Sequence, residues 1–268
     1  MTTTSDRTMP GGGSAWVLPA PGVAPAGRPL RPRLICFAYA GRGASVFQAW
    51  QGLLGDTADV CSVQLPAREE RLHDAPVTEV AALRQELLPR LRPWLDGPFV
   101  LFGHCMGALL AADLAVALRA DDGIEPDALI LSGAAPPWQQ ESLGDDLGAM
   151  TDGEFIRGLR KAGALTARQI AEPAALALML PAIRADYQLF ESTRRQRPRP
   201  SVPPLRCPMS LFAGDADAAI LPEQVRDWGA LSAGRSELTV FAGDHFFLET
   251  AAELVAGRVG DEIRRVCR

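Results

Sequence analysis

Long apolar runs are missing from this chain of 268 residues. No window approaches the roughly 18 consecutive apolar residues of a membrane-spanning helix, which argues against a membrane protein built from such helices. A strong excess of positive charge is also missing, because the formal net charge is -5. Nucleic acid is therefore a poor candidate for the main partner. We expect a protein that acts without a membrane or a nucleic acid.

Cysteine and histidine are too few and too scattered to indicate a metal centre. The five cysteines show no metal-type spacing, and there are only three histidines. Cys36, Cys61 and Cys207 stand in or beside apolar runs, which favours small buried side chains. An odd set of this kind predicts a reduced, cytoplasmic protein. The sequence implies neither a metal nor an organic cofactor.

The N-terminal residues lack the apolar segment of a secretion signal and are rich in Gly, Pro, Thr and Ala. We therefore predict a disordered leader over residues 1–33. The remaining residues, 34–268, have the length and composition of one domain with a sizeable core.

From residue 34 onward, short apolar runs alternate with helical patterns. Most of the runs are continuously apolar, which is typical of a parallel sheet covered on both faces. Predicted strands are 34–39, 60–65, 99–102, 128–132, 209–213 and 238–241. Predicted helices are 80–91 with Thr78 as its cap, 108–118 and 248–266. The alternation predicts an α/β fold with a mostly parallel, doubly wound sheet.

Residues 137–200 break this alternation, because they show helical patterns and no strand pattern. Thr151 and Glu154 form a capping-box signature for one helix. A second helix is predicted over residues 174–191, interrupted at Pro181. Such an insertion after the fourth predicted strand is where a lid would lie. A basic, proline-broken segment, Arg194 to Arg199, leads back to the sheet.

The stretch Gly103-His104-Cys105-Met106-Gly107 stands between a predicted strand and a predicted helix. A strand, a sharp turn with a nucleophile and a helix make up a nucleophile elbow. The glycines on either side leave room for a tightly packed turn. Cys105 is therefore the candidate nucleophile.

Three histidines make the search for a general base short. His245 stands after the last predicted strand, where the base follows nucleophile and acid in chain order. The carboxylate that orients it should follow the strand 209–213, and we favour Asp217 over Asp215. His104 and His73 are interpreted as structural or solvent-facing.

Backbone amides complete the candidate site. The N–H of Met106 follows the nucleophile, and a second donor should come from the loop after the first predicted strand. We favour the amide of Ala40 there, with that of Gly41 as the alternative. Candidate substrate-binding residues are Gly41, Arg42, Phe155 and Met179. An apolar acyl chamber under the lid would be lined by Met150, Phe155, Ile156, Leu159, Leu178, Met179 and Ile183, although packing of the lid itself explains these residues equally well.

Several stretches together resemble the type II thioesterases that accompany modular polyketide synthases and nonribosomal peptide synthetases. They are residues 34–41, 64–71, 102–108, 184–187, 207–209 and 243–248, and the likeness extends over residues 34–266. The resemblance implies an α/β-hydrolase fold and hydrolysis of acyl thioesters on the phosphopantetheine arm of acyl or peptidyl carrier proteins. By motif match, it places the nucleophile, aspartate and histidine at Cys105, Asp217 and His245.

Three positions depart from the family pattern. Members usually have serine at position 105, glycine at 67 and a second glycine at 42, where this chain has Cys105, Ala67 and Arg42. Arg42 would influence which acyl groups enter, and Ala67 the geometry of its loop.

A cysteine nucleophile converts one thioester into another, so acylation is close to thermoneutral and the acyl-enzyme stays activated toward amines and thiols. An acyltransferase or cyclase is therefore an alternative to a hydrolase. A non-catalytic carrier-binding accessory protein and a free-standing esterase are further alternatives. We expect a monomer whose partner is a carrier protein, with the Arg194–Arg199 segment as a candidate docking site.

Overall fold

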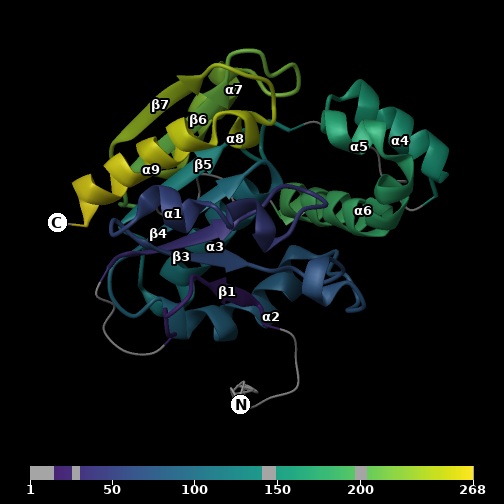
Figure 1. Cartoon of the computed structure of the whole chain (residues 1–268). Coiled ribbons are helices and arrows are strands. Elements are labelled where there is room, and N and C mark those ends of the chain that lie inside the picture. The colour runs from purple at the N-terminus through teal and green to yellow at the C-terminus, as the bar shows by residue number, and fades with distance from the viewer. Residues whose placement is uncertain (1–14, 26–30, 141–148, 197–203, 268) are drawn as a thin grey trace, which may run out of the picture.

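The computed structural model describes residues 15–25, 31–140, 149–196 and 204–267. Its centre is a sheet with helices on both faces (Figure 1). In sequence order the strands are β1 (Val17–Pro19), β2 (Arg33–Phe37), β3 (Asp59–Val63), β4 (Phe99–His104), β5 (Ala128–Ser132), β6 (Met209–Gly214) and β7 (Ser236–Phe241). Their spatial order is β1-β3-β2-β4-β5-β6-β7, and β1 alone among them runs antiparallel to its neighbour. The predicted α/β fold with a mostly parallel sheet is confirmed.

The first strand is the part of the sheet that sequence reasoning missed. Val17 pairs with Val63 and Pro19 pairs with Cys61, so the predicted disordered leader of residues 1–33 is wrong where β1 lies. Trp16 and Val17 are buried, and the guanidinium of Arg71 lies 4.1 Å from the Trp16 ring centre. A strand of three residues is too short to show a periodic pattern, and distant contacts hold it in place.

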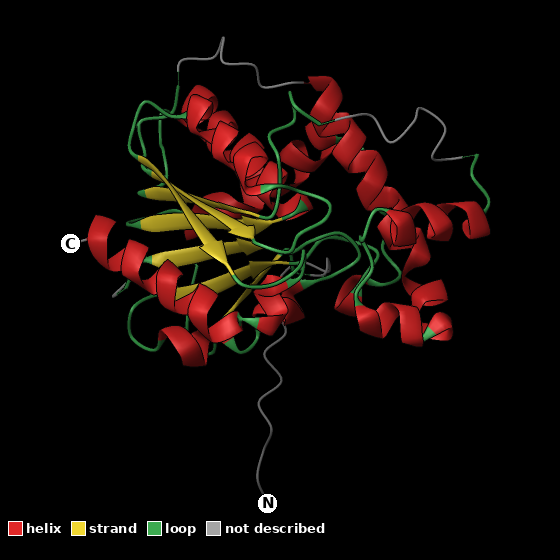
Figure 2. Ribbon diagram, turned by 90° about the horizontal axis from the view of Figure 1, so that it is seen from above, coloured by secondary structure: helices red, strands yellow, loops and turns green. Residues whose placement is uncertain are grey.

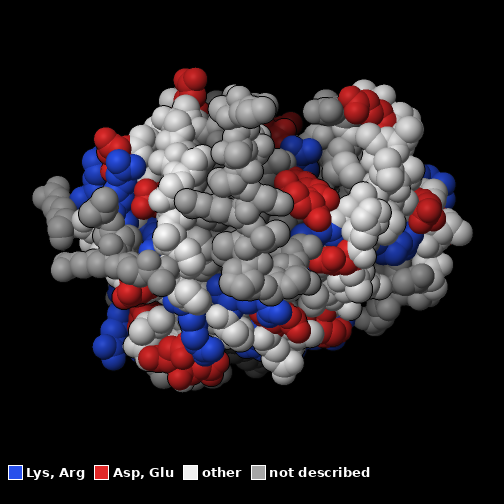
Figure 3. Space-filling view, turned by 60° about the horizontal axis from the view of Figure 1, so that its bottom comes forward, with Lys and Arg blue, Asp and Glu red and all other residues white. Residues whose placement is uncertain are grey.

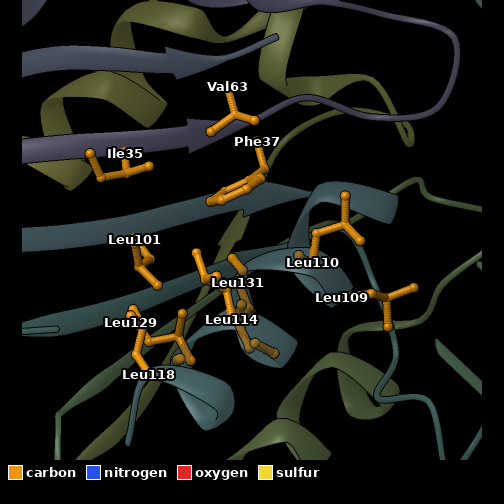
Figure 4. Close-up of a cluster of buried hydrophobic side chains, with 14 of the residues drawn as sticks. Ile35, Phe37, Val63, Leu101, Leu109, Leu110, Leu114, Leu118, Leu129 and Leu131 are labelled. Carbon is orange, nitrogen blue, oxygen red and sulfur yellow. The ribbon is translucent and has the colours of Figure 1, made fainter. Parts of the chain in front are cut away.

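Alternate residues along each strand enter opposite cores, because successive side chains of a strand point to opposite faces. On one face, α2 (Val80–Leu91) and α3 (Met106–Asp122) cover side chains such as Ile35 and Leu101. On the other, α1 (Trp50–Leu54) and α9 (Ala252–Val266) cover Leu34 and Val100. Figure 2 shows the strands between these helix layers, and Figure 4 shows Leu114 and Leu118 of α3 beside Leu129 and Leu131 of β5.

Two helix boundaries differ from the prediction. Thr78 does not cap α2, whose N-cap is Glu79 without a side-chain cap. The first-turn amide of Val80 instead donates to Ser192 Oγ at 2.9 Å, so a distant helix replaces the local cap. The last predicted helix is divided at Ala251 into α8 (Phe247–Thr250) and α9.

The described residues between β5 and β6 form three helices of the predicted helical insertion: α4 (Asp152–Lys161), α5 (Ala167–Ala171) and α6 (Pro173–Gln196). They lie beside the body, on the side toward which the parallel strands point (Figure 1). The capping box at Thr151 and Glu154 is confirmed. The predicted interruption at Pro181 is wrong, because α6 continues through it. Pro181 is exposed while its neighbours Leu180 and Ile183 are buried, so packing outweighs the lost backbone donor.

The remaining described elements are short. They are η1 (Ala44–Phe47), η2 (Glu69–Arg71), η3 (Arg92–Trp94), η4 (Asp227–Leu231) and α7 (Pro222–Arg226). None of the described helices is long and apolar enough to cross a membrane.

Candidate active site

Cys105 occupies a strained turn between β4 and α3. Its φ of 54° lies in the left-handed region, which a residue other than glycine adopts only when its surroundings impose it. The elbow glycines allow the close approach: a Cβ on Gly103 would lie 2.0 Å from the Gly107 carbonyl oxygen, and a Cβ on Gly107 would lie 2.2 Å from that of Phe37. The predicted strand–turn–helix arrangement is confirmed.

The loops after β6 and β7 bring an aspartate and a histidine together. Asp217 Oδ2 lies 2.7 Å from His245 Nδ1, and both residues are buried. Asp217 Oδ1 accepts the amides of Ala219 and Ile220 at 2.8 and 3.0 Å, which fixes the carboxylate. The alternative, Asp215, is exposed and accepts the amide of Gly243. The geometry therefore favours Asp217 as the orienting carboxylate.

The charges of this cluster favour a protonated histidine. Burial alone would lower the pKa of His245, but the negative charge of Cys105 and the hydrogen bonds to Asp217 and Cys105 raise it to about 10. Burial opposes ionisation of Asp217, and its hydrogen bonds to His245 and to two backbone amides outweigh that effect, so its pKa is lowered. A cysteine beside a histidine that a carboxylate holds is the arrangement that activates a cysteine nucleophile.

The His104 ring contacts the backbone of the loop that contains His245. Its Nε2 lies 2.9 Å from the carbonyl oxygen of His245, so Nε2 carries the proton and Nδ1 accepts from Ser132 Oγ at 2.8 Å. Complete burial lowers the pKa of His104 to about 3, which keeps the ring neutral. His104 is thus structural rather than solvent-facing, whereas His73 is exposed.

The loop after β2 and the start of α3 supply the candidate oxyanion donors. The amide of Gly41 donates to Asp186 Oδ2 at 2.7 Å, so it is already used. Within the described ranges, the backbone amides of Ala40 and Met106 have no protein acceptor. The structure therefore favours Ala40 over Gly41 as the partner of Met106 in an oxyanion hole.

The apolar residues of the helical insertion mostly pack against one another. Phe155 is 3% exposed and meets the Tyr187 ring edge-on at 5.6 Å and the Arg184 guanidinium at 4.6 Å. It belongs to a cluster with Leu159, Leu165, Leu176, Leu180 and Ile183, with Met179 at the margin. The prediction that Leu178 lines an enclosed chamber is wrong, because its side chain is 69% exposed.

Arg42 lies beside the oxyanion loop with a partly exposed side chain, 3.8 Å from Glu249. The candidate docking arginines give less support: Arg194 and Arg195 are paired at 2.8 Å with Glu191 and Glu79, and residues 197–200 lie outside the described ranges. The face shown in Figure 3 mixes both charge signs instead of gathering one.

No group of three or more His, Cys, Asp or Glu side chains in the described ranges is arranged to hold a metal ion. Sequence reasoning also missed two buried residues near the site, Arg68 and Asp186. Both stand in stretches that carried the family resemblance, which was the one available signal.

Comparisons with known proteins show the family of this chain. The family model described as a thioesterase domain matches residues 32–263. Gramicidin S biosynthesis protein GrsT of Aneurinibacillus migulanus is 30% identical over 83% of this chain and 86% of its own length. Thioesterase PikA5 of Streptomyces venezuelae is 30% identical over 86% of this chain and 80% of its own.

Among solved structures, the type II thioesterase BorB from the borrelidin biosynthetic cluster superposes with a TM-score of 0.78. It is 34% identical and covers 92% of this chain and 97% of that one. The family model spans most of the chain and the structural likeness spans nearly all of it. The chain therefore belongs to the thioesterase family and has its α/β-hydrolase fold.

Proposed function

We propose that this thioesterase is a type II enzyme that hydrolyses acyl groups from phosphopantetheine-bound carrier proteins of a polyketide or nonribosomal peptide synthase. The observation that carries the proposal is the Cys105 thiol at the elbow, within hydrogen-bond reach of His245, which is paired with the buried Asp217. The names of GrsT, for gramicidin S biosynthesis, and of BorB, a type II thioesterase of a biosynthetic cluster, support this substrate class.

In the acylation step, the Cys105 thiolate attacks the thioester carbonyl carbon and forms a bond from Sγ. The carbonyl oxygen takes up the negative charge and accepts hydrogen bonds from the amides of Ala40 and Met106. The bond to the pantetheine sulfur then breaks. His245 gives the proton on Nε2 to that leaving sulfur, while Asp217 holds Nδ1.

Acylation itself prepares His245 for the second step. The negative charge of Cys105 is one cause of the raised pKa of His245, and acylation removes that charge. The pKa of His245 therefore falls in the acyl-enzyme, and the neutral ring can take a proton from water. The resulting hydroxide attacks the acyl carbon, the bond to Sγ breaks, and the acid leaves with the ion pair restored.

The cysteine at the elbow also favours a second candidate function. An acyl group on Cys105 is a thioester that an amine, hydroxyl or thiol acceptor could attack in place of water, so an acyltransferase or cyclase is consistent with the same site. The third alternative, a non-catalytic carrier-binding protein, is disfavoured. Such a protein has no need for the buried hydrogen bond between His245 and Asp217.

A panel of acyl-phosphopantetheinyl carrier proteins tests the proposal. We expect wild type to release free acid and to show an acylated mass in rapidly quenched samples. Cys105→Ala should show neither. Cys267→Ala is the matched control, because Cys267 is a second partly exposed free cysteine, at the end of α9.

Full turnover by Cys105→Ala would overturn the assignment of the nucleophile. If no member of the panel yields free acid while a simple acyl thioester is hydrolysed, the proposed carrier-bound substrate class is wrong. Repeating the reaction with amine acceptors separates the two catalytic functions, because a transferase yields the amide while a hydrolase continues to yield the acid.

A further inference from the structure

Two buried charged residues link the lid helix α6 to the body. Arg68 and Asp186 are 5% and 1% exposed. They form a bidentate ion pair, in which Arg68 Nη1 donates to Asp186 Oδ2 at 2.6 Å and Arg68 Nη2 donates to Asp186 Oδ1 at 2.8 Å. A buried ion pair adds little net stability, because removing both charges from water offsets most of their attraction. Fold stability alone is therefore a weak reason for this pair.

The pair contacts the loop that carries the candidate oxyanion donor. Asp186 Oδ2 accepts the amide of Gly41 at 2.7 Å, and Arg68 Nη1 donates to the carbonyl of Arg42 at 3.4 Å. Gly41 has φ of 75°, and a Cβ at this position would lie 2.4 Å from Ile183 Cγ1 on α6. The lid helix thus packs directly on this loop, at a point that only glycine can occupy.

These contacts determine the direction of the Ala40 amide. The Arg42 amide donates to the Tyr39 carbonyl at 3.1 Å, and with the positive φ of Gly41 this makes a type II turn over residues 39–42. The bond to the Tyr39 carbonyl fixes the peptide plane before Ala40, and the bond from the Gly41 amide fixes the plane after it. Because a trans peptide points its N–H away from its carbonyl, the Ala40 N–H is aimed away from the turn.

The loop that contains Arg68 has a strained backbone conformation. Its two neighbours, Ala67 and Glu69, have φ of 66° and 48°, in the left-handed region. The buried side chain of Gln64 donates to the Arg68 carbonyl at 3.0 Å and accepts the Ala44 amide at 2.7 Å. Strain of this kind persists only where the surrounding contacts require the conformation.

We infer that Asp186 and Arg68 are positioning residues, which hold the Ala40 amide in the orientation that receives the oxyanion. The carboxylate orients the loop, and the guanidinium cancels a negative charge that would otherwise oppose the developing oxyanion. The lid helix therefore takes part in forming the oxyanion hole. This inference rests on the proposed function, because it takes Cys105 as the nucleophile.

Two reactions of the same sulfur separate positioning from a structural role. Attack on an acyl thioester develops an oxyanion, whereas alkylation of Cys105 by iodoacetamide displaces iodide and develops none. Both need the thiolate beside His245. The readout is the ratio of the thioester acylation rate to the alkylation rate, with alkylation followed by mass spectrometry on the peptide that contains Cys105.

Three variants test the pair and one serves as control. Asp186→Asn and Arg68→Lys each alter one member, while the double variant Arg68→Met with Asp186→Leu removes both charges and leaves the Gly41 amide without its acceptor. Replacing a buried ion pair with apolar residues is often tolerated, so the double variant keeps the test decisive if a single variant does not fold. Glu191→Gln is the matched control, since Glu191 is a buried acid of the same helix paired with Arg194.

We expect the acylation rate of the variants to fall by about 10²-fold while alkylation stays near wild type, because one misplaced donor has a cost of that order. Glu191→Gln should keep the wild-type ratio. An unchanged ratio in the folded double variant would overturn the inference, as would an equal change in the control. If wild-type enzyme alkylated at Cys105 keeps its turnover, the proposed nucleophile is wrong. That result is distinct from an unchanged ratio in the double variant, which contradicts only the positioning role.

Discussion

Single residues at the site show how closely chemical roles depend on position. Asp215 and Asp217 are two positions apart after the same strand and have the same side chain. Asp217 is buried against His245, while Asp215 is exposed and accepts a backbone amide. The difference lies in which carboxylate the loop turns inward.

This pair gives a residue-scale prediction. Asp217→Asn should lower kcat/KM for an acyl thioester by about 10²–10⁴-fold, because the amide cannot hold the protonated imidazole as the carboxylate does. Asp215→Asn is the matched control and should stay close to wild type. Steady-state kinetics on both variants checks the prediction, and a comparable loss in the two would contradict the assignment of Asp217.

Elements were predicted well where their pattern is long and local. The six runs of apolar residues from residue 34 onward all form strands, and 128–132 agrees to the residue with β5. Errors occurred where a distant contact replaced the local signal. Ser192 takes the capping position expected of Thr78, and buried neighbours carry α6 through Pro181.

The elbow yields an element-scale prediction, because two helical glycines differ only in their surroundings. Gly107 in α3 faces the Phe37 carbonyl, whereas Gly257 in α9 has nothing within 4 Å of an added Cβ. Gly107→Ala should lower the free energy of unfolding by about 1–3 kcal/mol through the backbone clash. Gly257→Ala should raise it by about 0.5–1 kcal/mol, since alanine favours a helix. Urea unfolding measures both, and equal stability of the two variants would refute the close approach.

At the scale of the whole molecule, the buried neutral His104 links stability to pH. Burial holds the pKa of His104 at about 3 in the folded chain, against about 6.5 when unfolded. Between these values the unfolded chain binds the extra proton. The contribution of neutral His104 to the free energy of unfolding is therefore fully present above about pH 6.5 and is lost as the pH falls toward 3.

His104→Gln isolates this contribution, because glutamine can replace both hydrogen bonds but does not titrate. Relative to the variant, wild type should lose about 1.4 kcal/mol of unfolding free energy per pH unit between about pH 6 and 4. Asp113, whose pKa burial raises to about 6, titrates in the same range but is common to both proteins and cancels. Urea unfolding across this range is the measurement, and parallel curves would show that His104 is not buried neutral.

Patterns along the sequence were sufficient to predict the architecture and to select the catalytic candidates. Continuous apolar runs separated by helical patterns specify a covered parallel sheet, and the loops after its strands necessarily meet at one edge. Cys105, Asp217 and His245 each follow such a strand, so their convergence could be expected from the sequence.

The tertiary structure alone shows which of two neighbouring candidate groups has a hydrogen-bond partner. The choice of Asp217 over Asp215 and of Ala40 over Gly41 depends on which group a partner far along the chain occupies. Asp186 is 145 residues from Gly41 and 118 from Arg68, and no local pattern encodes those contacts. Their physical basis is the burial of polar groups, which must find hydrogen-bond partners wherever the fold places them.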